Sequence, residues 1–150
     1  MPSKPNYFTS FTVDPLLVRS QLRLEELDPC RIGIALLTAI GEEASKSGAA
    51  GVKTGAVGGM HGFLSMRIGG CPMSILIGVY LKNTESVVFW ILTQTGKRRL
   101  LDRISNRLDC DYANTEINCR SLIQKALEKH FKIHAITWRP EDEYRGLDDL

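Results

Sequence analysis

Two residues of this chain carry the side chains that a thiol hydrolase needs. Cys30 follows an aspartate–proline pair at a predicted helix start, and His61 comes just before a predicted strand. The dipole of a helix favours a thiolate at its N-terminus, and a neighbouring histidine can act as the base. However, no third residue that would orient His61 can be identified. A cysteine on a core helix is more often a small buried hydrophobe, so the Cys30–His61 hydrolase is kept only as an alternative.

The second feature is the glycine-rich segment 48–62, in which six of fifteen residues are glycine. A phosphate-binding loop needs a glycine directly before its lysine and a strand before the motif. Here Val52 precedes Lys53 and a helix precedes the segment, so we reject that function. Unhindered backbone N–H groups near Lys53 could still bind an anion. The segment is predicted to be a connecting loop or lid that contributes Lys53 to a contact surface.

The third feature is a predicted basic helix at 97–108. Arg99, Arg103 and Arg107 are spaced four residues apart and therefore form one stripe on a helix. Arg98 extends this charge at the helix start. Guanidinium groups bind carboxylates and phosphates in a fork, which suggests a partner surface. The alternative is a solvated face with local ion pairs.

A metal site is not expected. The two cysteines and two histidines in the C-terminal part are spaced unlike the ligands of a structural zinc site. They are Cys110, Cys119, His130 and His134. We predict no metal and no cofactor.

Two helices are predicted near the N-terminus, over about 15–27 and 29–47. Each begins with an aspartate N-cap followed by proline, in 13-VDPL-16 and 27-LDPC-30. The second is apolar almost all round from Ile32 to Ile40, which indicates a buried helix.

Three strands are predicted after the glycine-rich segment, at 63–68, 73–81 and 87–95, and they form an antiparallel meander. Beyond the basic helix we expect a helix at 115–131 and one further strand at 132–138. A short edge strand at Tyr7–Val13 is a further possibility. The predicted fold is α+β, with one sheet covered by helices.

The length of 150 residues suits one domain, here residues 1–140, followed by a flexible acidic tail at 141–150. The net charge is +2, but segment 44–100 carries seven basic residues and one acidic residue. With no signal peptide and no CxxC pair, we expect a cytoplasmic protein with reduced thiols.

The function that follows is that of a small non-enzymatic binding, adaptor or regulatory protein. Its contact surface would be the basic helix (Arg98, Arg99, Arg103 and Arg107) and the glycine-rich segment with Lys53. The expected partner is a protein, and the positive charge of the surface favours an acidic one. A homodimer would cover the exposed edge of the sheet. The alternatives are nucleic-acid binding through the arginine stripe and the Cys30–His61 hydrolase.

Overall fold

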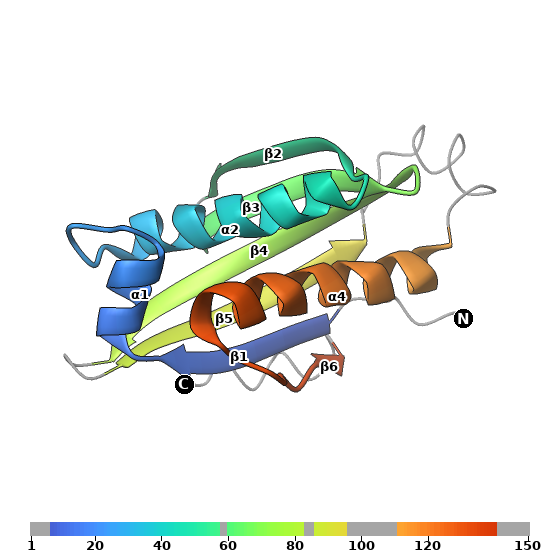
Figure 1. The fold of residues 1–150 in the computed structure, drawn as a ribbon. Coiled ribbons are helices and arrows are strands. Elements are labelled where there is room, and N and C mark those ends of the chain that lie inside the picture. The colour runs from blue at the N-terminus through green and yellow to red at the C-terminus, as the bar shows by residue number, and fades with distance from the viewer. Residues whose placement is uncertain (1–6, 58–59, 83–85, 96–110, 141–150) are drawn as a thin grey trace.

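A computed structural model describes residues 7–57, 60–82, 86–95 and 111–140, and it shows one antiparallel sheet with its helices on one face (Figure 1). The predicted α+β class is confirmed. The elements are β1 (Tyr7–Val13), α1 (Pro15–Gln21), α2 (Pro29–Lys46), β2 (Ala50–Val57), β3 (Met60–Ile68), β4 (Cys71–Lys82), β5 (Ser86–Thr95), α4 (Tyr112–Phe131) and β6 (Arg139–Pro140). The order across the sheet is β2-β3-β4-β5-β1-β6.

The two N-terminal helices begin at aspartate caps. The Asp14 carboxylate accepts a hydrogen bond from the Leu16 backbone N–H at 2.8 Å, and the Asp28 carboxylate accepts one from that of Arg31 at 3.1 Å. Helix α1 ends at Gln21, six residues before the predicted end at 27. The chain then turns through Arg23, whose φ is 55°. Helix α2 ends at Lys46, one residue from its predicted end.

The cap of α2 gives a direct test of this local interaction. Replacing Asp28 with alanine is expected to destabilise the protein by about 1 kcal/mol, because the N–H group of Arg31 loses its acceptor. Replacing it with asparagine retains an acceptor and should cost only a fraction of that. Urea denaturation of both variants measures the difference. Equal losses in the two would show that the charge of Asp28, rather than its cap, stabilises the helix.

The hydrophobic core lies between the sheet and helices α2 and α4. Helix α2 packs on β2, β3 and β4, while α4 lies mainly over β4 and β5 (Figure 1). Fully buried side chains of the two helices meet those of the sheet. They include Ile32, Leu36, Ile40, Leu64, Ile75, Ile77, Phe89, Ile91, Ile123 and Leu127. The second face of the sheet contacts no described helix (Figure 1).

The prediction of a loop at 48–62 was wrong, because β2 and the first residues of β3 occupy most of this segment. The pairing of β2 with β3 is interrupted between Ala50 and Lys53 and again after Gly55. Gly51, in the first irregularity, has a φ of 63°, which favours glycine. Glycines that suggested a mobile connector therefore serve a bulged edge strand.

The C-terminal strand was also predicted incorrectly. Segment 132–138 forms no strand, and β6 consists of only two residues paired with Tyr7 and Phe8 of β1. Lys132, at the end of α4, has the left-handed φ of 56°, and the Thr9 hydroxyl donates to the Thr137 carbonyl at 2.7 Å. This side-chain hydrogen bond takes the place of the backbone hydrogen bonds that a strand pair would make there. Helix α4 begins at Tyr112, three residues before the prediction.

Two predicted segments lie outside the described residues. They are the basic helix 97–108, with Arg98, Arg99, Arg103 and Arg107, and the acidic tail 141–150.

Candidate functional site

The charged side chains of the described strands are all positive, and they lie on one face of the sheet. The described strands contain no aspartate or glutamate, and they hold four lysine or arginine residues, all exposed. Three of these alternate with residues of the core: Lys53 follows Val52, Arg67 follows Met66 and Lys82 follows Leu81. Because successive side chains of a strand point to opposite faces, these cations lie on the face away from the helices. Arg139 pairs with Phe8 on the same face.

We call this surface the basic face. Cross-strand pairing places its residues in rows, with Phe63, Leu76, Leu92 and Phe8 side by side in one of them. The residues that define it are Phe8, Lys53, Gly55, Phe63, Ser65, Arg67, Ser74, Leu76, Gly78, Tyr80, Lys82, Val88, Trp90, Leu92, Gln94 and Arg139.

In the part of the chain that the structure describes, no carboxylate neutralises the cations of the basic face. Within the described residues, none of the four takes part in an ion pair. Arg67 donates a hydrogen bond from Nη1 to the Gly70 carbonyl at 3.3 Å, which holds its guanidinium at the β3–β4 turn. The helix layer differs, since Lys46 and Lys129 both lie 3.8 Å from the carboxylate of Glu43. The unbalanced positive charge of the described structure is therefore on the sheet.

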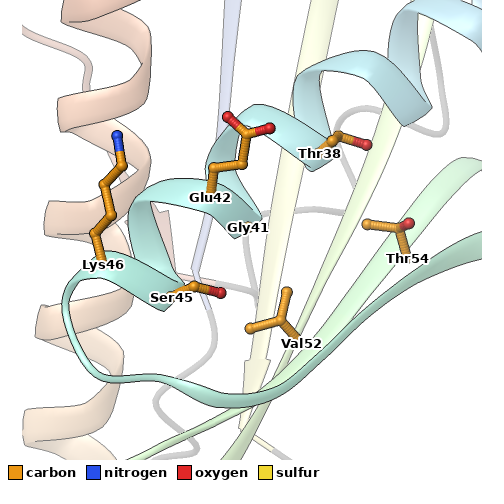
Figure 2. A pocket seen from close by; sticks show the side chains of 7 residues that line it. All are labelled: Thr38, Gly41, Glu42, Ser45, Lys46, Val52 and Thr54. Carbon is orange, nitrogen blue, oxygen red and sulfur yellow. The ribbon is translucent and has the colours of Figure 1, made fainter.

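A groove between α2 and β2 is the second candidate. Its volume is about 420 Å³, and it is lined by Thr38, Gly41, Glu42, Ser45, Lys46, Val52 and Thr54. Figure 2 shows Val52 pointing from β2 toward α2, whereas Lys46 points away from β2. The carboxylate of Glu42 also points away from β2, so hydroxyls and the apolar Val52 side chain lie between the two elements. The groove has no converging acid and base with which to catalyse a reaction.

A buried polar cluster between α4, β5 and β1 is the third candidate. Glu116 of α4 is 1% exposed, and both its carboxylate oxygens lie 2.8 Å from the Thr93 hydroxyl of β5. Burial raises the pKa of Glu116 to about 7, against the opposing effects of the Thr93 hydrogen bond and the Arg120 charge. Burial and the negative charge of Glu116 also raise the pKa of Cys119, which is fully buried beside it.

Arg120 joins this cluster to β1. Its Nε lies 3.2 Å from Oε1 of Glu116, but the N–H is not aligned for a hydrogen bond, so the contact is an ion pair only. Its guanidinium lies over the Tyr7 ring, 4.2 Å from the ring centre. The cluster therefore ties α4 to β1 and β5, and its ionisable groups face one another rather than an open pocket.

The sequence did not single out Glu116, although a signal was present. Cys119, Ile123 and Ala126 are core positions on one face of α4. Position 116 precedes Cys119 by three residues and Ile123 by seven, so helical spacing places it on the same face. Ile117, the apolar residue next to it, is instead 55% exposed.

The sequence candidates Cys30 and His61 occupy neighbouring elements. Cys30 is exposed at the second residue of α2, and His61 lies half-buried on β3. The Nδ1 atom of His61 accepts a hydrogen bond from the Val79 backbone N–H at 2.8 Å. The lone pair of Nδ1 is occupied by this hydrogen bond, and a neutral ring then carries its hydrogen on Nε2, so the ring offers no free acceptor for a thiol proton while the bond is made. The hydrolase stays a prediction, with this bond weighing against it.

The remaining candidates are placed as follows. Lys53 lies on the basic face. Cys119 is buried and His134 is exposed, while Cys110 is outside the described residues. In the part of the chain that the structure describes, no three histidine, cysteine or acidic residues are grouped to hold a metal ion.

Comparison with known proteins identifies no relative: no family model, no curated protein and no solved structure matches the chain. None of the described helices is long and apolar enough to cross a membrane. Of the three candidate sites, only the basic face carries exposed charge of a single sign.

Proposed function

We propose that this protein is a non-enzymatic binding protein and that its basic face contacts an anionic polymer. The observation that carries the proposal is that all four cations of the described strands, Lys53, Arg67, Lys82 and Arg139, are exposed on one face without a carboxylate among them. The proposal keeps Lys53 as a contact residue. The arginine stripe at 97–108 lies outside the described residues and is a separate prediction.

The spacing of these cations suits an extended partner rather than a small anion. Arg67 and Lys53 lie on neighbouring strands at one end of the sheet, and Lys82 is at the far end of β4. From Pro72, which pairs with Arg67, to Lys82 the strand advances about 34 Å at ~3.4 Å per residue. Unit charges this far apart cannot share one small ligand, because direct interactions are screened beyond about 10 Å at 0.1 M salt. A polymer with repeated negative charges can contact all of them.

The test compares two variants that lose the same charge from different faces. The first carries Lys53→Gln, Arg67→Gln and Lys82→Gln. The control carries Arg31→Gln, Lys46→Gln and Lys125→Gln, three exposed cations of the helix layer. Binding to heparin is measured by titration over a range of salt concentrations.

The basic-face variant is expected to bind heparin at least about tenfold more weakly at low salt, with a flatter dependence of affinity on salt, because fewer counterions are released. The control should remain close to the unmodified protein. Equal losses in both variants would mean that net charge alone determines binding. Unchanged affinity in the first variant would remove the basic face as the contact surface.

A further inference from the structure

Two aromatic residues of the basic face, Phe63 and Tyr80, lie outside the core, whereas Phe8 on the same face is buried. The side chains packed between sheet and helices include neither Phe63 nor Tyr80. Tyr80 is 60% exposed, one of the most exposed large apolar side chains described, and Phe63 is half-buried. An aromatic ring gains from burial, so the exposed surface of Tyr80 and the exposed part of Phe63 are available for contact with a ligand.

Phe63 is held in place by a glycine of the neighbouring strand. Gly55 is its cross-strand partner, and a Cβ atom at Gly55 would lie 2.7 Å from Cε1 and 3.0 Å from Cζ of the ring. The ring therefore fills the space that a side chain at position 55 would take. This packing fixes the ring against the sheet surface. A ligand that binds the ring therefore costs little further side-chain entropy.

The two rings lie between the cations. Phe63 pairs with Leu76, and Tyr80 is four residues farther along β4, about 13 Å away. Lys53 and Arg67 lie beyond Phe63, and Lys82 lies beyond Tyr80. Along the direction of β4, the order of these side chains is therefore basic, aromatic, aromatic and basic.

Polar groups lie beside this line. Ser65, Ser74 and Gln94 form one cross-strand row with Lys53 and are half-buried. Their hydroxyl and amide groups can donate and accept hydrogen bonds at the sheet surface. Positive charge alone would suit an acidic peptide equally well. Aromatic rings flanked by cations and small polar groups are instead the surface on which unpaired bases stack while their phosphates meet lysine and arginine.

From this arrangement, and resting on the proposed function, we propose that the basic face binds single-stranded nucleic acid. Phosphates contact Lys53, Arg67 and Lys82, and bases stack on Phe63 and Tyr80. A duplex does not fit this chemistry, because its bases are stacked within the helix and its grooves are read by protruding helices or ribbons. The described part of the basic face presents neither.

The experiment separates stacking from charge. The probes are a labelled 12-nucleotide DNA of mixed sequence and an abasic strand of the same length, both measured by fluorescence anisotropy at one salt concentration. The unmodified protein is expected to bind the base-bearing strand roughly tenfold more tightly than the abasic strand, and more tightly than the same sequence as a duplex. The variant Phe63→Leu/Tyr80→Leu keeps the apolar volume and should bind the two single strands with nearly equal affinity.

The outcomes distinguish this proposal from the one on which it rests. Heparin binding that is lost in the basic-face variant, together with no preference for the base-bearing strand, overturns the nucleic-acid proposal and leaves the anionic contact standing. A leucine variant that loses heparin and both strands alike assigns the aromatic residues to the structure of the sheet and also overturns it. Should the double variant not fold, Tyr80→Ser alone tests the stacking, because Tyr80 is largely exposed. A preference unchanged in that variant counts against the proposal.

Discussion

Replacing Glu116 with glutamine is expected to abolish a loss of stability that the protein undergoes as the pH rises from about 4.5 to about 7. The native pKa of Glu116 is raised from 4.5 to about 7, mainly by burial. The folded protein therefore holds this proton more tightly than the unfolded chain does. Stability from this group is fully present below pH 4.5, declines as the pH rises, and is lost above about 7. The shift corresponds to about 3 kcal/mol, to order of magnitude.

The difference in unfolding free energy between the Glu116→Gln variant and the unmodified protein isolates this effect. Urea denaturation at several pH values from 4.5 to 8 should show the variant gaining up to about 3 kcal/mol relative to the unmodified protein across that range. Any constant cost of burying the amide cancels in this comparison. Glu128→Gln, at an exposed position of the same helix, is the control for removing a carboxylate from α4. A flat difference for Glu116→Gln would show that its carboxylate titrates normally in the folded protein.

Much of the fold could be predicted from local sequence signals. Asp14 and Asp28 marked the starts of α1 and α2, because a cap involves only residues within one turn. The period-two pattern of 73–81 identified β4, since its alternation reflects burial on one face.

The errors arose where distant residues determine the structure. The glycines of β2 resemble a flexible connector until Phe63 of the next strand is placed over Gly55. Likewise, Thr9, far away in the sequence, holds the segment after α4 through the Thr137 carbonyl. Tertiary contacts of this kind leave no periodic signal in the segment itself.

The candidate site was predicted only in part, and for a similar reason. Lys53 was identified from its glycine-rich surroundings, but Arg67 and Lys82 were counted only as part of a basic middle region. Their position on one face depends on the register of three strands. That register also places Phe63 and Tyr80 between them, so the aromatic residues on which the proposed nucleic-acid contact rests become apparent only when the strands are paired.

Replacing Gly33 with alanine is expected to destabilise the protein by about 3 kcal/mol, although glycine-to-alanine changes inside helices usually stabilise by up to about 1 kcal/mol. A Cβ atom at this position of α2 would overlap the backbone carbonyl oxygen of His61 and lie 3.0 Å from its carbonyl carbon. These atoms belong to β3 and cannot rotate away as a side chain can. The helix must shift instead, and this disturbs Ile32 and Leu36, which are fully buried beside it.

Gly41, two turns along the same helix, provides the matched control. Its added Cβ would meet the Val52 Cγ1 atom at 3.0 Å, which is a side-chain contact that can yield by a small rotation. Gly41→Ala should therefore change the unfolding free energy by less than about 1 kcal/mol. Hydrogen exchange of the Val79 amide gives a second measurement. Its N–H donates a hydrogen bond to the His61 ring and should exchange faster in Gly33→Ala. If Gly33→Ala were as stable as the unmodified protein, α2 and β3 would be farther apart than described, and the contact that positions His61 would have to be revised.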